Sequence, residues 1–185
     1  MEQTLIVFKP DTIKRGLIGE ILSRFERVGL KIIGMKMVQV DSKLASIHYP
    51  DSLADIIGKK TKVDWDNDGV EYTETSEEIG RIILEATREF MTSAPVVAIV
   101  LEGGHAVEVV RKLVGSTGPK DSAPGTIRGD YAHLSLGKAS AQKKGAANLI
   151  HASGTVEEAI DEIKLWFRPE ELFDYKLSHE DLTHV

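Results

Sequence analysis

Four short apolar runs constrain the fold of this chain more than any other feature of its 185 residues. Each is rich in aliphatic or β-branched residues, and they occupy residues 4–8, 31–40, 95–101 and 148–152. Between the runs, apolar residues recur at the spacing of amphipathic helices, as in Leu17, Ile21 and Phe25. This alternation predicts an α+β fold of the ferredoxin-like sandwich type, with a four-stranded antiparallel sheet and helices on one face.

Short sequence signals place the ends of the predicted helices. Gly29 follows a helix over residues 17–28 as a capping glycine would, and Asp41 begins another short helix. Thr75 and Glu78 have the spacing of a capping box ahead of a longer helix. These signals are independent of the apolar faces, so they support the same order of elements.

Two polar segments interrupt this order, near residues 50–75 and 131–147. Within the first, apolar and polar residues alternate on both sides of a glycine-containing turn at 67–69, which predicts a small hairpin over residues 63–72. The second segment has no clear periodicity. We expect both to be insertions in a single domain that spans residues 1–185.

Composition excludes several classes of protein. The chain has 23 Lys and Arg against 29 Asp and Glu, a net charge of −6 and a pI of about 5.5, so a surface for nucleic acid or for an anionic membrane is not expected. It has no Cys, which rules out disulfides and thiolate chemistry. The first residues lack a basic leader and a long apolar stretch, so we expect a cytoplasmic protein.

The densest group of chemically able residues is the segment 148–153, Asn-Leu-Ile-His-Ala-Ser. A helix that begins at Thr155 would bring Glu162 back toward His151, and a hydroxyl and a carboxylate beside an imidazole can hold it in one tautomer. His151 would then be a nucleophile toward phosphorus. An ordinary structural histidine beside a helix start fits these residues equally well.

A second group surrounds the Gly- and Pro-rich segment 115–130. Arg111, Thr117 and Arg128 could grip a polyphosphate, because guanidinium groups match phosphate oxygens and glycines let backbone N–H groups approach. A surface loop tied by an ion pair from Arg128 to Asp130 or Asp121 explains the same residues. Lys9 ends the first strand and would project from the sheet edge toward such a site.

Other motifs carry no prediction of function. Residues 64–69 match the start of an EF-hand loop, but the twelfth position is Thr75, where Glu is required. Neither the P-loop nor the GxGxxG nucleotide motif is present. The remaining histidines have no metal-ligand spacing and are expected to be structural or solvated; they are His48, His105, His133, His179 and His184.

Taken in order, the separate groups resemble the nucleoside diphosphate kinase family. The matching stretches are TLIVFKPD at 4–11, RGLIGEILSRFE at 15–26, APVVAIVLEG at 94–103, GSTGPKDSAPGTIRGD at 115–130, NLIHAS at 148–153 and EIKLWFRPEEL at 162–172. The resemblance covers nearly the whole chain apart from the two insertions. Its most specific part is PGTIRGD followed by NxxHxS.

The resemblance implies ping-pong transfer of phosphate from nucleoside tri- to diphosphates through a pros-phosphohistidine at His151. Ser153 and Glu162 would orient the imidazole, and Lys9 would assist catalysis. Mg²⁺ would be carried by the nucleotide phosphates without a metal site on the protein, and the protein would be a homo-oligomer, either a hexamer or a tetramer. The residues that would hold phosphates, ribose and base are Lys9, Tyr49, Ile83, Arg111, Thr117, Arg128 and Asn148.

The chain departs from the family pattern at two positions. The aromatic residue that family members stack on the base falls near Ile83, so base packing is weaker or comes from Trp65 or Tyr72 of the first insertion. Gly154 stands where the family usually has Asp, which removes a side chain that could reach the metal through water. The first insertion lies where the family's nucleotide-gripping helices form a lid.

Two functions of other classes stay open. A binding or scaffold protein derived from the family would have weak or no kinase activity and would use the insertions for a partner. Retention of Arg111, Arg128 and Glu162 argues against that hypothesis. A ferredoxin-like RNA-binding module would need several strand aromatics and a basic face, whereas Phe8 is the strand aromatic found and the net charge is negative.

Overall fold

A four-stranded antiparallel sheet forms the centre of the computed structural model, which describes residues 1–178 and 180–183. The predicted four-stranded antiparallel sheet is therefore confirmed. His179 and His184, for which a structural or solvated role was expected, lie outside the described residues. The strands, in the order β2-β3-β1-β4 across the sheet, are β1 (Glu2–Phe8), β2 (Lys31–Val38), β3 (Val96–Gly103) and β4 (Ile150–Ala152).

The apolar run of β1 is buried on both sides of the sheet, which corrects one part of the expected fold. Ile6 and Phe8 enter one core, whereas Leu5 and Val7 enter the other. All four side chains are fully buried, and each contributes about 1.5–3 kcal/mol relative to exposure. Because both faces are apolar, helices pack on both of them and not on one face only.

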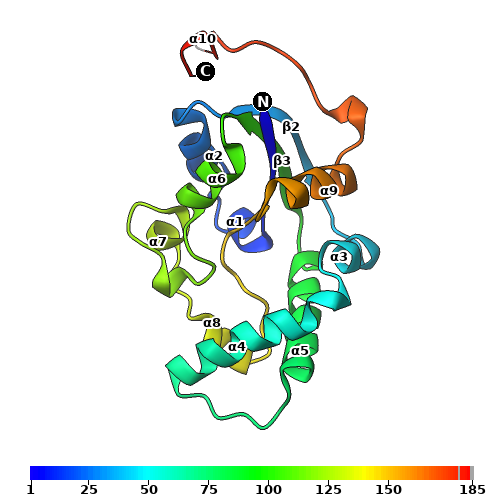
Figure 1. Ribbon diagram of the computed structural model, residues 1–185, viewed down its shortest axis with the longest axis vertical. Helices are drawn as coiled ribbons and strands as arrows, with labels where there is room; N and C mark the ends of the chain where they lie inside the picture. The colour runs from blue at the N-terminus through cyan, green and yellow to red at the C-terminus, as the bar shows by residue number, and fades with distance from the viewer. Residues whose placement is uncertain (179, 184–185) are drawn as a thin grey trace.

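The two crossover helices, α2 (Ile18–Arg27) and α6 (Ala106–Val114), cover the face that carries Phe8. The opposite face is covered by α3 (Ser42–His48), by α9 (Val156–Trp166) and by one end of α5 (Ser76–Thr92). In Figure 1, α2 and α6 lie to the left of the sheet, and α3 and α9 lie to its right. The sheet is therefore the middle layer of three.

The first insertion is helical, so the predicted hairpin over residues 63–72 is wrong. It forms α4 (Ala54–Asp68), whose C-cap is Gly69 at φ 68° and ψ 33°. The glycine that suggested a hairpin turn therefore ends a helix in the left-handed conformation. The buried residues of α4 recur at helical spacing and are Ala54, Gly58, Thr61 and Trp65.

The backbones of α4 and α5 approach closely near the start of each helix. A Cβ at Gly58 would lie 1.7 Å from the Ser76 carbonyl oxygen, and one at Gly80 would lie 1.8 Å from the Ala54 carbonyl oxygen. Only glycine permits this approach. The Thr75 capping box predicted at the start of α5 is confirmed.

The two insertions contact each other, as α4 and α8 do at the bottom of Figure 1. The second insertion contains α8 (Leu136–Ala141). The Trp65 indole N–H on α4 reaches the Ser140 hydroxyl at 2.7 Å and the Gly137 carbonyl at 3.0 Å. Asp68 at the end of α4 pairs with Lys120 at 2.8 Å. We refer to α4, α5 and α8 together as the helical lid.

The remaining elements are short. No helix among the described residues has both the length and the apolar character needed to cross a membrane. The short helices and 3₁₀ turns are α1 (Pro10–Lys14), α7 (Ile127–Tyr131), α10 (Glu180–Thr183), Asp51–Leu53, Pro119–Asp121 and Pro169–Glu171.

Candidate active site

His151 lies on β4 within a hydrogen-bonded group that can support nucleophilic chemistry. Its Nε2 is 2.8 Å from Glu162 Oε1, and the Ser153 hydroxyl donates to Glu162 Oε2 at 2.6 Å. Burial opposes ionisation of Glu162, but the hydrogen bond and charge of His151 outweigh it and hold the pKa of this carboxyl below its usual value. An ionised carboxylate only accepts, so we assign the imidazole proton to Nε2 and the lone pair to Nδ1.

Leu149 immediately precedes β4 and interrupts the extended backbone there. Its φ is +73°, in the left-handed region, which a non-glycine residue keeps only where its surroundings hold it there. The Leu149 N–H donates to Asp11 Oδ2 at 2.9 Å, while its carbonyl accepts from the Lys9 N–H and from the Thr12 hydroxyl. The backbone therefore bends at Leu149. In a straight strand Asn148 and His151, three residues apart, would point to opposite faces of the sheet.

Lys9 and Asn148 form a buried polar pair at the end of β1. The Lys9 side chain is 5% exposed, and its Nζ donates to Asn148 Oδ1 at 2.8 Å. The Asn148 amide in turn donates to the Thr117 carbonyl at 2.8 Å. Burial, reinforced by the charge of Arg128, lowers the pKa of Lys9 to about 7. An anionic phosphate beside this ammonium would restore its full charge.

Arg128 joins the phosphate-binding segment to the strand that carries the histidine. Its Nε donates to the Asn148 carbonyl at 3.1 Å, and its Nη2 donates to the Ile150 carbonyl at 2.6 Å. The alternative in which Arg128 pairs with Asp130 is wrong, because Asp130 forms its ion pair with Arg24 at 2.6 Å. Arg128 is thus a buried cation held by backbone carbonyls.

Arg111 supplies a second guanidinium from the last turn of α6. Its side chain is exposed. Burial, reinforced by the charge of Arg111, lowers the pKa of Arg128 to about 10. Thr117, also exposed, lies on the loop whose carbonyl binds the Asn148 amide. Two cations and a hydroxyl therefore border the same segment, as a polyphosphate site requires.

His48, for which a structural or solvated role was expected, lies next to His151. It is 8% exposed, and its ring contacts the His151 ring edge-on with 4.4 Å between centroids. Its Nδ1 accepts from the Trp166 indole at 3.2 Å, and burial, together with the charge of His151, lowers its pKa to about 3. The sequence feature that could have placed His48 at this site is its position next to Tyr49, a predicted site residue. The Tyr49 ring lies 6.3 Å from that of His151.

Ile83 lies away from this group, on α5 of the helical lid. Its half-buried side chain lines a small hollow of about 150 Å³ together with Trp65 and Lys143, one from each insertion. The Trp65 indole is already bound to α8, so the candidate replacement aromatic packs against the second insertion. The structure therefore does not bring Ile83 into direct contact with the histidine group.

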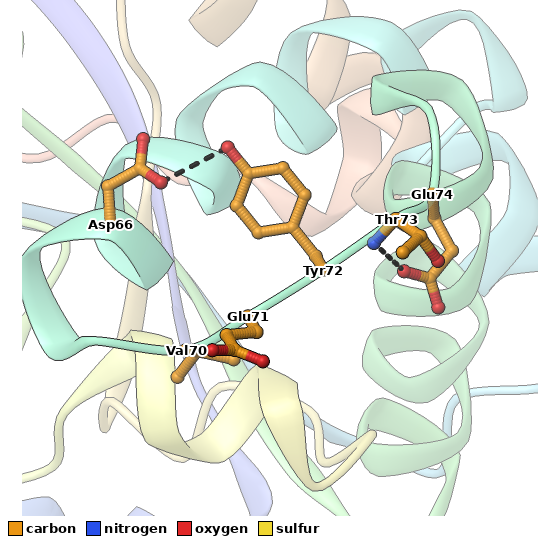
Figure 2. A pocket seen from close by; sticks show the side chains of 6 residues that line it. All are labelled: Asp66, Val70, Glu71, Tyr72, Thr73 and Glu74. Atoms are coloured by element: carbon orange, nitrogen blue, oxygen red, sulfur yellow. Dashed lines mark hydrogen bonds between the residues drawn. The ribbon is translucent and has the colours of Figure 1, made fainter.

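A larger hollow beside the helical lid does not fit a phosphate group. It has a volume of about 660 Å³ and lies along the connection between α4 and α5 (Figure 2). Figure 2 shows Tyr72 reaching Asp66, which accepts from its hydroxyl at 3.1 Å, and Glu74 accepting from the Thr73 N–H at 3.0 Å. With Glu71 also on its wall, the lining is acidic and would repel an anionic ligand.

The space beside Gly154 is filled by the end of the exposed Glu158 side chain. Its N–H donates to Glu158 Oε2 at 2.8 Å, and a Cβ at this position would lie 2.5 Å from that same oxygen. Thr155 caps α9 through the Glu158 N–H, as expected for a structural Glu158. A carboxylate from the first turn of α9 thus occupies the space that a side chain at 154 would need.

The fold and the site together define a class of protein. A carboxylate-bound histidine beside a buried lysine and two arginines is an arrangement suited to phosphoryl transfer through a phosphorylated histidine.

Comparisons with known proteins agree with this class. A sequence model described as nucleoside diphosphate kinase matches residues 2–57 and 56–172. The chain is 46% identical over 175 residues to the nucleoside diphosphate kinase of Pyrococcus furiosus, covering 95% of this chain and 88% of the relative. It is also 43% identical over 181 residues to the nucleoside diphosphate kinase of Pyrobaculum aerophilum, covering 94% and 99%. The chain belongs to the nucleoside diphosphate kinase family.

Two solved structures share the fold. The NDP kinase of Pyrobaculum aerophilum superimposes with a TM-score of 0.88 at 42% identity, covering 94% of this chain and 99% of that one. The nucleoside-diphosphate kinase of Borrelia burgdorferi, solved as a transition state mimic with vanadate and ADP, has a TM-score of 0.81 at 38% identity. It covers 98% of this chain and 96% of its own. The ferredoxin-like α+β fold is therefore shared with family members across nearly the whole length.

Proposed function

We propose that this protein is an active nucleoside diphosphate kinase that works through a pros-phosphohistidine at His151. The observation that carries the proposal is the 2.8 Å contact between His151 Nε2 and an ionised Glu162. It assigns the proton to Nε2 and leaves the Nδ1 lone pair to attack phosphorus. In the family member from Borrelia burgdorferi, vanadate and ADP are bound together as a transition state mimic, which supports the same reaction class.

The reaction would proceed in two half-reactions of the same geometry. Nδ1 of His151 attacks the γ-phosphorus of a nucleoside triphosphate, the bond to the bridging oxygen breaks, and the diphosphate leaves. Glu162 stabilises the positive charge that the ring gains, because it accepts from Nε2–H. Lys9, Arg111 and Arg128 neutralise the transferred phosphoryl oxygens. A second diphosphate then attacks the phosphohistidine and restores the free imidazole.

Mg²⁺ would enter with the nucleotide and would not need a site on the protein. Mg²⁺ prefers oxygen ligands in octahedral geometry. Among the described residues, the side chains close enough together to contact one ion are two histidines and Glu162, which offer two nitrogens and one carboxylate. The cations at this site instead suit the phosphates of a nucleotide that carries its own metal. When bound, the metal would offset phosphate charge and orient the γ-phosphate.

A labelling experiment tests the proposal directly. Incubation with ³²P-labelled ATP and Mg²⁺ should label the protein with acid-labile, alkali-stable phosphate, since that stability is typical of a phosphohistidine. His151→Ala should remain unlabelled and should lose phosphotransfer to a diphosphate acceptor, while His105→Asn, at an exposed position, should keep both. A wild-type protein that binds nucleotide but takes up no label would instead favour the scaffold hypothesis.

We also propose a cytoplasmic homo-oligomer. β2 is at the edge of the described sheet, and its Met35 and Met37 side chains are 55% and 61% exposed. Apolar side chains at an open strand edge favour pairing with a second copy of the same edge. Light scattering coupled to size-exclusion chromatography should give a hexamer or a tetramer, and a monomer for the wild type would contradict this proposal.

A further inference from the structure

Three side chains at the active site lie close enough together to contact one metal ion. Ligand atoms of His48, His151 and Glu162 all lie within 4.8 Å of one another. From Glu162 Oε1 the distances are 2.8 Å to His151 Nε2 and 3.8 Å to His48 Nδ1. In a tetrahedral zinc site with bonds of about 2.1 Å, ligand atoms are about 3.4 Å apart. The observed distances lie on either side of that value, so small side-chain shifts would complete the site.

The two ring nitrogens of His48 have different surroundings. The imidazole is buried, and its Nε2 has no hydrogen-bond partner among the described residues. Its Nδ1 accepts from the Trp166 indole, a single bond that metal coordination would replace. The nitrogen next to Glu162 is therefore Nδ1, at 3.8 Å from Oε1, and a metal ion there would take the lone pair that now accepts from Trp166.

We propose that His48, His151 and Glu162 form a binding site for a divalent transition-metal cation such as Zn²⁺, and that its occupation blocks the histidine nucleophile. Two imidazoles and one carboxylate are a usual zinc donor set and leave a fourth position for water. Mg²⁺ does not compete, because it prefers oxygen ligands.

The block follows from the tautomer of His151. In the metal-free site Nε2 carries the proton and donates it to Glu162, while Nδ1 holds the lone pair. A metal ion takes a lone pair on Nε2, so the single proton of the neutral ring moves to Nδ1. Nδ1 then has no lone pair with which to attack phosphorus. The metal inhibits without touching the phosphate-binding residues.

Binding is tested first without nucleotide, using Co²⁺ as a spectroscopic probe for Zn²⁺. Chelator-treated protein should bind one equivalent of Co²⁺ with the intense visible absorption of a tetrahedral complex, and Zn²⁺ but not Mg²⁺ should displace it. His48→Phe, which keeps the aromatic packing, and Glu162→Gln should each weaken binding by at least about tenfold. The control His105→Asn should bind like the wild type. Absence of a stoichiometric Co²⁺ complex overturns the proposal, whether or not the protein is a kinase.

Inhibition is tested next, with saturating Mg²⁺-nucleotides and added Zn²⁺. The measured quantity is the ratio of rates with and without Zn²⁺, so a change in the basal rate of a variant cancels. The half-inhibiting Zn²⁺ concentration should rise by at least about tenfold in His48→Phe and in His48→Asn, because both lose a ligand nitrogen. Equal inhibition of these variants and of His105→Asn shows that Zn²⁺ acts through the nucleotide and overturns the site.

Discussion

The group around His151 and the helical lid are built on different principles. Around the histidine, several of the anchoring bonds involve backbone groups: Arg128 binds two carbonyls of the strand segment, and the Leu149 carbonyl accepts from the Lys9 N–H at the end of β1. In the lid, α4 is joined to its neighbours by side chains: the Trp65 indole binds α8, and Asp68 pairs with Lys120 of the Pro119–Asp121 turn. Backbone-held geometry is set once the sheet forms, whereas side-chain contacts between surface helices can open separately.

This difference assigns separate tasks to the two regions. The backbone-held group carries the charges that a phosphoryl transfer requires, and small displacements there would be costly. The helical lid carries Ile83 and both insertions, where the chain departs most from the family pattern. We therefore expect changes at the histidine group to lower kcat, and changes in the lid to act on nucleotide KM and on local stability.

The largest expected effect is from Lys9→Ala. It removes a buried cation that would face the transferred phosphate, so kcat/KM should fall by about 100- to 1,000-fold. Steady-state phosphotransfer assays measure it, with Lys14→Ala on the exposed side of α1 as the matched control. A loss below about tenfold would mean that other residues neutralise the phosphate, and it would contradict the functional difference between the two regions.

The pH dependence of nucleotide binding sharpens the role of Lys9. Its pKa in the free protein is about 7, lowered by burial and by Arg128, and a bound phosphate favours the charged form. Above pH 7 binding must therefore take up a proton, and affinity should fall by up to about tenfold per pH unit as the pH rises. Calorimetry at pH 8 in buffers of different ionisation enthalpy detects the uptake, which Lys9→Ala should abolish.

A smaller effect is expected from Trp65→Phe in the lid. The change keeps an aromatic side chain but replaces the indole by a smaller ring and removes two hydrogen bonds to α8, which should weaken its docking by about 1–2 kcal/mol. Hydrogen exchange should rise over residues 136–141 and nucleotide KM should increase, with kcat unchanged. Tyr72→Phe, which loses only an exposed bond to Asp66, is the control. A fall in kcat equal to that of Lys9→Ala would show that the two regions do not act separately.

The smallest effect is expected from Ile83→Phe. An aromatic ring at this position could stack on a nucleotide base, which is worth about 0.5–1.5 kcal/mol, so KM should fall by about twofold to tenfold. The neighbouring Ile82→Phe tests whether any added ring has the same effect. An increase in KM for Ile83→Phe alone would mean that the hollow between the insertions is filled by the ring and that the base binds elsewhere.

Sequence reasoning succeeded wherever a local rule governed the outcome. The capping box at Thr75, the N-cap at Asp41 and the four strands are all present. It failed at α4, because a glycine after alternating residues is compatible both with a hairpin turn and with a helix C-cap, and tertiary burial of one side chose the helix. It also overlooked the unbroken apolar character of β1, which required cover on both faces.

The sequence by itself determined the family and the candidate residues, because motifs such as PGTIRGD and NLIHAS depend on residue identity and order alone. Only the tertiary structure decided how these residues act together. The bend at Leu149, the contact of His48 with His151 and the docking of one insertion on the other join residues far apart in the chain. Such contacts depend on packing between elements, which no local pattern in a single sequence encodes.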